Sequence, residues 1–132
     1  MKIEKQVCNL KLAKSLKELG AKQDSLFYWY PKPKVIHNSG GVVECNGYKI
    51  LFGDKARIYG VNAKYSAFTA AELGEILPEK YLSVQMENNF AWECSHIDIT
   101  EYAEFANTEA NARAKMLIYL IENNLTKQEE TR

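Results

Sequence analysis

The chain has no long apolar run and no excess of charge of either sign. Its 132 residues include 17 basic and 17 acidic side chains, and no stretch approaches the roughly 18 consecutive apolar residues that a membrane-crossing helix needs. A balanced chain produces no overall field that attracts polymeric nucleic acid or a membrane surface. We therefore expect neither a nucleic acid polymer nor a membrane among its partners.

Cysteine is scarce, and its spacing does not indicate a disulfide framework. Cys8, Cys45 and Cys94 are odd in number and far apart, whereas secreted disulfide domains carry even, closely spaced sets. The first residues, Met1 to Lys5, lack the apolar core of a signal peptide. These absences predict a cytoplasmic protein.

Catalytic signatures are also missing. The sequence has no nucleophile elbow, no phosphate loop and no dinucleotide fingerprint. His37 is isolated, and Cys94 to His96 offers two metal ligands at most, whereas zinc needs three or four. Asp54 and Asp98 are not spaced as a recognisable carboxylate pair. We expect no enzyme, no cofactor and no metal, although a cysteine–histidine couple stays open as an alternative.

Two helix signals mark the first half of the chain, which the length predicts to be one domain, 1–132, with a frayed tail at 126–132. Leu10 to Leu19 has an apolar stripe and lies between a capping Asn9 and the terminator Gly20. The second signal is the capping box from Thr69 to Glu72, and Pro78 ends that helix after about two turns.

Short strands account for most of the remainder. The expected strands are Ser25–Tyr30, Lys34–His37, Val42–Cys45, Tyr48–Phe52, Arg57–Tyr59, Tyr81–Met86 and Phe90–Cys94. Pro31 and Pro33 are expected to end the first strand. Asn38 to Gly41 and Asn46-Gly47 are expected to form hairpin turns. Thr100 to Ala106 is either a loop or a helical turn. The predicted class is α+β: an antiparallel β-sheet meander with N-terminal and C-terminal helices on one face and a short helix inserted mid-chain.

The last helix, Thr108 to Asn124, carries an arginine at the border of its apolar face. At 100° per residue Ala110, Ala114, Leu117 and Ile121 form one stripe. Arg113 lies beside that stripe, whereas Lys115 points away. The only other arginines are Arg57 and the terminal Arg132, so the planar guanidinium is a candidate to hold phosphate or carboxylate. An internal pair between Arg113 and a glutamate is the alternative.

Aromatic residues alternate along two of the predicted strands. In Phe27 to Tyr30, one face receives Phe27 and Trp29 and the other receives Tyr28 and Tyr30, near Lys32 and Lys34. The tyrosine face either stacks on a planar base or is covered by a loop or a second subunit. Phe90 and Trp92 likewise share a face and are either core residues or a second stacking site.

Three blocks of the sequence resemble a widespread group of small phage and prophage proteins. The blocks are Gln6–Trp29, Tyr65–Pro78 and Thr108–Asn124, in the same order. The segment from Pro31 to Gly60 departs most from that group. A functional site known in the group is therefore least expected to apply to this segment. The resemblance implies a protein that acts in an infected or lysogenic bacterial cell.

Small α+β phage proteins include sponges that sequester nucleotide immune signals, such as the Thoeris anti-defence and anti-CBASS proteins. By analogy we expect a non-enzymatic, homo-oligomeric binder of a cyclic or ADP-ribose-type nucleotide. The residues expected to hold the base are Tyr28, Tyr30, Phe90 and Trp92, and those expected near the phosphates are Arg57, Arg113 and Lys115. The rival hypothesis is an accessory module that blocks a host protein through the same aromatic surface.

Overall fold

The structure is a computed structural model that describes residues 2–36, 43–53, 64–87, 91–99 and 101–125. Its elements, in chain order, are α1 (Ile3–Gln6), α2 (Leu10–Glu18), β1 (Phe27–Ile36), β2 (Val43–Phe52), β3 (Tyr65–Ser66), α4 (Ala70–Ile76), β4 (Tyr81–Gln85), β5 (Trp92–His96), β6 (Ala103–Ala106) and α5 (Glu109–Glu122). The α+β class is confirmed, with helices towards both ends of the chain and one in the middle. The predicted features at 38–41, 57–59 and 126–132 lie outside the described residues.

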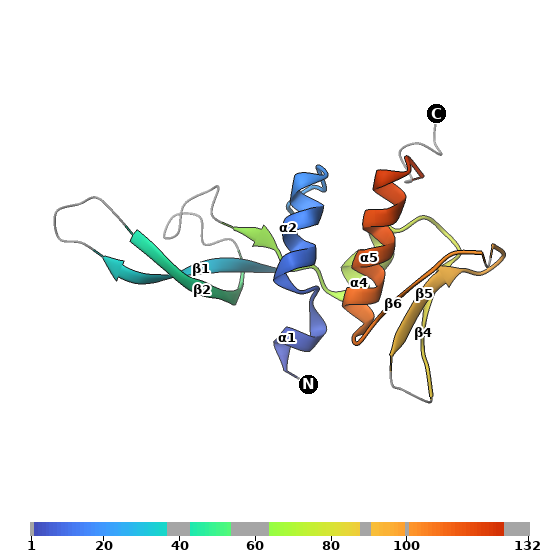
Figure 1. Cartoon of the computed structure of the whole chain (residues 1–132), viewed down its shortest axis with the longest axis horizontal. Helices are drawn as coiled ribbons and strands as arrows, with labels where there is room; N and C mark the ends of the chain where they lie inside the picture. Colours follow the sequence, from blue (N-terminus) through green and yellow to red (C-terminus); the bar gives the residue numbers. More distant parts are fainter. Residues whose placement is uncertain (1, 37–42, 54–63, 88–90, 100, 126–132) are drawn as a thin grey trace.

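The strands are divided between two antiparallel sheets and do not form the one continuous meander that the sequence predicts. The orders are β2-β1-β3 and β4-β5-β6. Figure 1 shows the sheets towards opposite ends of the molecule, with α2 and α5 between them. The segment that contains α4 connects the first sheet to the second. The short turns between neighbouring strands, from which the meander was predicted, do not show that the strands belong to two sheets.

The capping residues define both short helices as predicted. The Asn9 side chain accepts a hydrogen bond from the Leu12 N–H at 2.9 Å, and Gly20 ends α2 with a φ of +90°. At the start of α4, the Thr69 side chain and Glu72 form the reciprocal capping box. Both helices therefore begin where their sequence signals lie.

β1 and β2 form a long hairpin arm, and two local predictions within it are wrong. β1 continues through both prolines, because register shifts between Pro31 and Val35 accommodate the missing N–H groups. Asn46-Gly47 lies inside β2 and does not turn the chain. Pro31 pairs with Tyr48 and Pro33 with Cys45, so Gly47, with a φ of +82°, uses its left-handed conformation within an irregular stretch of the ladder.

The segment left open between loop and helical turn contains β6, which pairs with β5. β6 leads directly into α5, which Thr108 caps by accepting from the Asn111 N–H. The buried core joins α5 to α2 and α4, and its members include Leu16, Phe68, Leu73, Cys94, Ala110, Ala114, Met116, Leu117 and Leu120. Three of the four residues of the predicted α5 stripe are thus fully buried. No helix within the described part of the chain is long and apolar enough to cross a membrane.

Candidate ligand cavity

Arg113 is held inside the chain by three elements. Its Nε donates to Ser83 Oγ at 2.9 Å, and its Nη1 donates to the Ala70 carbonyl at 2.6 Å. Its Nη2 lies 3.2 Å from Glu109 Oε2, one turn earlier on α5. All three guanidinium nitrogens are therefore used between α5, β4 and the start of α4. The internal pair with a glutamate, the alternative that the sequence left open, is the arrangement observed.

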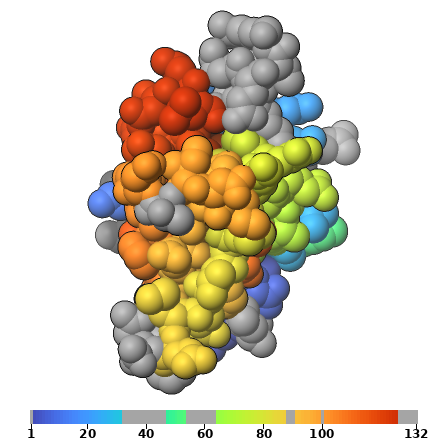
Figure 2. Space-filling view, turned by 90° about the vertical axis from the view of Figure 1, so that its right-hand side faces the viewer, coloured from blue at the N-terminus to red at the C-terminus, as the bar shows by residue number. Residues whose placement is uncertain are grey.

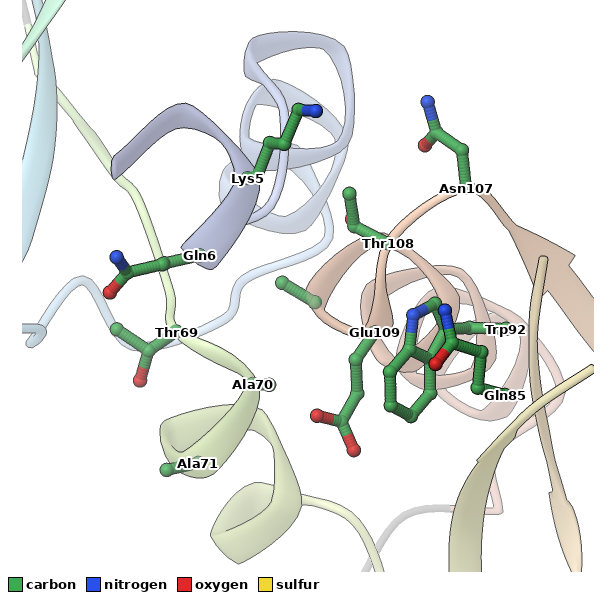
Figure 3. Close-up of a pocket in the computed structure, with 11 residues that line it drawn as sticks. Lys5, Gln6, Thr69, Ala70, Ala71, Gln85, Trp92, Asn107, Thr108 and Glu109 are labelled. Carbon is green, nitrogen blue, oxygen red and sulfur yellow. The ribbon is translucent and has the colours of Figure 1, made fainter. Parts of the chain in front are cut away.

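This cluster supports two walls of a hollow that opens beside it, since Ala70 and Glu109 both line that hollow. The cavity has a volume of about 500 Å³ and is lined by Lys5, Gln6, Thr69, Ala70, Ala71, Gln85, Trp92, Asn107, Thr108, Glu109 and Ala110. Figure 3 shows it among α1, the start of α4, the start of α5 and the sheet. Arg113 does not line the cavity, but it hydrogen-bonds the Ala70 carbonyl and pairs with Glu109, which do.

Among the described residues, Trp92 provides the aromatic wall of this cavity. It alternates along β5 with Glu93 and lies on the same side as the buried Cys94, so it belongs to the inner face of the sheet. The side chain is only partly buried, because it packs against the core and also borders the cavity. The two alternatives given for this residue, packing and stacking, are therefore compatible.

Polar groups surround the indole. Glu109 and Ala110 occupy the first turn of α5, where backbone N–H groups have no partner within the helix. Lys5 and Asn107 stand at the upper rim in Figure 3, and Gln85 lies beside Trp92. The Glu109 carboxylate accepts from Ser83 and pairs with Arg113, which fixes its position. The described lining thus combines an aromatic surface, the cation of Lys5, a carboxylate held in place and several amide and hydroxyl groups.

The tyrosines of β1 are buried, so a covered face, one of the two alternatives that the sequence left open, is the arrangement observed, and neither ring is available to stack on a base. They lie on the opposite side of β1 from Trp29, as the alternation predicts, but only 5% of Tyr28 and 0% of Tyr30 is exposed. The Tyr30 hydroxyl donates to the Gly53 carbonyl, and the Lys64 ammonium lies 4.4 Å from the centre of the Tyr28 ring. Both rings are structural.

The other predicted contact residues lie elsewhere. Lys115 donates to the Phe105 carbonyl at 2.9 Å and borders a second hollow of about 320 Å³ between α2 and α5, together with Tyr102 and Tyr119. Arg57 and Phe90 lie outside the described residues. Of the five predicted site residues that the structure describes, only Trp92 lines the cavity at the start of α5.

Nucleophilic chemistry has little support among the described residues. Burial raises the pKa of the Cys8 thiol to about 12. Burial also raises the pKa of the Cys94 thiol to about 11, although Arg113 opposes the shift. A thiolate is the reactive form, so both thiols stay protonated at neutral pH. His96 Nδ1 accepts from the Asp98 and Ile99 N–H groups. No group of three or more potential metal ligands occurs among the described residues.

Most residues of the cavity lining have no local signal in the sequence. Lys5 and Gln6 belong to α1, a single turn that the helix patterns missed, and Gln85 and Asn107 are polar residues at element ends. Three separate parts of the chain contribute these four residues, and only the fold brings them together. The cavity lies where the capped starts of α4 and α5 meet. The capping residues Thr69 and Thr108 are therefore the sequence feature that comes closest to indicating its position.

No known protein family, curated protein or solved structure matches this chain. The resemblance to phage proteins therefore stays a prediction, and the cavity is judged by its own geometry.

Proposed function

We propose that this chain is a non-enzymatic binding protein that holds a nucleotide in the cavity beside Trp92. The observation that carries the proposal is a hollow of about 500 Å³ with an indole wall and a polar rim. Small-molecule sites commonly have volumes of roughly 300–1,000 Å³ and combine apolar or aromatic walls with a few fixed polar groups. The cavity meets both conditions.

The lining matches the parts of a nucleotide. A base stacks on the indole of Trp92, since aromatic rings accept any planar base. The side-chain amides of Gln6, Gln85 and Asn107 offer both donors and acceptors to its edge and to the ribose. A phosphate meets Lys5 and the N–H groups at the start of α5, where the helix dipole favours negative charge.

Arg113 supports this site without touching the ligand. By holding Glu109 and the Ala70 carbonyl, it keeps two walls of the cavity in place before a ligand arrives. Preformed walls raise affinity because less conformational freedom is lost on binding. One nucleoside unit of a cyclic or ADP-ribose-type nucleotide occupies the cavity in this proposal. The purpose, sequestration of a nucleotide immune signal, is proposed by analogy with phage sponge proteins.

A thermal-shift panel tests the proposal. Cyclic di-AMP, cyclic GMP–AMP and cyclic ADP-ribose isomers are each added to the chain, with free ribose as the control. A ligand at about 100 times its Kd stabilises the folded state by about 2.7 kcal/mol, which raises the Tm by several degrees. Chromatography of the released ligand must show it unchanged. A chemically altered ligand contradicts a non-enzymatic role, and no shift with any nucleotide contradicts nucleotide binding.

A protein-interaction module is the second candidate. The observation that favours it is the outer face of the β4-β5-β6 sheet, where Leu82, Val84 and Phe105 are exposed. Exposed apolar patches of this kind often mark protein contacts. In this case the thermal-shift panel gives no response, and replacing Trp92 leaves partner binding unchanged.

A further inference from the structure

Several polar side chains that line the cavity are already engaged in holding its walls together. The Glu109 carboxylate accepts from Ser83 and pairs with Arg113. Thr69 and Thr108 cap α4 and α5 through their hydroxyl groups. A ligand could take these groups as its main partners only by weakening contacts that the fold uses.

The rest of the lining includes three amides and one lysine, and two of these four side chains are without a partner in the described residues. Asn107 Oδ1 accepts from Asn111 Nδ2 at 3.4 Å, and Gln6 also has a partner within the chain. The side chains of Lys5 and Gln85 make no hydrogen bond or ion pair with a described residue, and both residues are exposed. A ligand can therefore meet one ammonium and one amide without breaking a contact.

Gln85 lies directly opposite Trp92 in the second sheet. The β4–β5 ladder pairs these two positions, and on the same face it pairs Ser83 with the buried Cys94. Side chains at directly opposite positions have Cβ atoms roughly 4.5–5.5 Å apart. Figure 3 accordingly shows the amide of Gln85 beside the indole. A flat ring stacked on Trp92 therefore has this amide within reach of its edge.

The chemistry of an amide favours one base. Gln85 offers an acceptor and a donor side by side, and adenine carries the complementary pair, an N6 amino donor next to a ring-nitrogen acceptor. Guanine presents two acceptors, O6 and N7, at the corresponding edge. On its other edge guanine has three polar groups, of which one amide can satisfy only two, and a group left without a partner costs affinity.

We propose that the base held by Trp92 is adenine, that Gln85 selects it, and that Lys5 contacts the phosphate. This choice of base rests on the proposed function and narrows its ligand to an adenine nucleotide. A carboxylate at position 85 would reverse the selection. It accepts from the two adjacent N–H donors of guanine, whereas it repels the ring-nitrogen acceptor of adenine.

Cyclic di-AMP and cyclic di-GMP differ only in their bases and are the probes for this selection. Calorimetric titration measures their affinities for the unaltered chain, for Gln85→Glu and for Gln85→Met, which keeps the length of the side chain without its polar groups. Leu82→Glu is the matched control for the added charge, because Leu82 lies on the same strand but on the outer face of the sheet. Figure 2 views the second sheet from this outer side, in yellow and orange. Both positions are exposed, so the fold is expected to persist, and circular dichroism checks it.

The expected result is a change in preference and not only in affinity. The unaltered chain and Leu82→Glu bind cyclic di-AMP at least about tenfold more tightly than cyclic di-GMP, since a two-bond amide contact discriminates between bases to about this extent. Gln85→Met binds the two ligands similarly, and Gln85→Glu prefers cyclic di-GMP. Lys5→Gln weakens both ligands alike, because a phosphate contact carries no information about the base.

Two results would overturn this inference and leave nucleotide binding in the cavity standing. One is an unaltered chain that binds both ligands equally or prefers cyclic di-GMP, and the other is a Gln85→Glu variant that still prefers cyclic di-AMP. If the unaltered chain binds neither ligand, and AMP and cyclic ADP-ribose do not bind either, the proposed function has failed together with the choice of adenine.

Discussion

The guanidinium of Arg113 lies directly against the backbone of Gly74. A Cβ atom added at Gly74 would stand 2.4 Å from Nη1 and 3.3 Å from Cζ of Arg113. The side chain of Arg113 is held at the same time by Ser83, Ala70 and Glu109. The absence of a side chain at Gly74 is therefore what lets the arginine join α4, α5 and β4.

Gly74→Ala is predicted to destabilise the protein, although alanine is normally the better helix residue by about 1 kcal/mol. The methyl group displaces the guanidinium, and weakened hydrogen bonds to a charged group lower the free energy of unfolding by a net of about 1–2 kcal/mol. Urea denaturation measures this change. In an Arg113→Ala background the same substitution is expected to raise stability by about 1 kcal/mol. An equal effect in both backgrounds would show that the two residues do not interact.

Arg113→Ala is predicted to lower stability by about 2–3 kcal/mol, because it leaves the Glu109 carboxylate and the Ala70 carbonyl without their partner. Arg113→Lys restores only part of the loss, since one ammonium cannot reach three separate acceptors. Chemical denaturation of the two variants checks both statements. Full stability in Arg113→Ala would contradict a structural role, and Arg113 would again be a candidate to contact a ligand.

Asn111 joins α5 to the start of α2 through a partly buried hydrogen bond. Its Oδ1 accepts from the Asn9 N–H at 2.8 Å, which connects α5 to the capping residue of α2. Asn111→Ala removes that acceptor and is predicted to lower stability by about 1 kcal/mol, the net value of a typical hydrogen bond, because the donor belongs to an exposed residue. Asn111→Asp keeps the acceptor and is the matched control, with a smaller loss. Equal losses in the two variants would mean that the side chain's shape, and not its acceptor, is what the helices need.

The buried thiols predict a loss of stability at alkaline pH. Burial raises the pKa of Cys8 from 9.0 to about 12 and that of Cys94 from 9.0 to about 11. Between pH 9 and 11 the unfolded chain releases these protons while the folded chain retains them, so stability falls as the pH rises. The slope is about 1.4 kcal/mol per pH unit for each thiol. Urea unfolding of the unaltered chain and of Cys8→Ala between pH 9 and 11 checks this prediction. The free energy of unfolding of the variant should fall less steeply with pH, by the contribution of one thiol. Equal slopes for the two proteins would contradict the prediction.

The capped helices were predictable because their signals are local. The caps predicted at Asn9 and Thr69 are both used in the structure, and Thr108 caps α5 in the same way. The ladder of β1 and β2 was less predictable. Gly47 has the left-handed conformation that a hairpin turn needs, but an irregularity within a strand needs the same conformation, and only the pairing partner distinguishes them.

The site could be predicted only in part. Trp92 was identified from its place in an alternating strand, and the structure gives it both a packing role and a cavity wall. Tyr28 and Tyr30 followed the same alternation, yet both are buried, because a strand pattern does not reveal what covers each face. Arg113 was correctly placed beside the apolar stripe, but its partners Ser83 and Ala70 come from distant segments. The zero net charge likewise does not reveal that basic side chains predominate in residues 1–64 and acidic side chains in residues 65–132.

Calorimetric titration of two variants of one cavity residue tests the central claim most directly. Ala71 is exposed on α4 and lines the cavity, so Ala71→Phe fills the space and Ala71→Ser leaves it open. The titrant is the cyclic nucleotide that raises the Tm most, and Trp92→Ala is titrated alongside. We predict that Ala71→Ser binds like the unaltered chain, whereas Ala71→Phe and Trp92→Ala bind at least about tenfold more weakly, since one stacked base contributes about 1–3 kcal/mol. Unchanged affinity in both of the latter variants would contradict a ligand site beside Trp92.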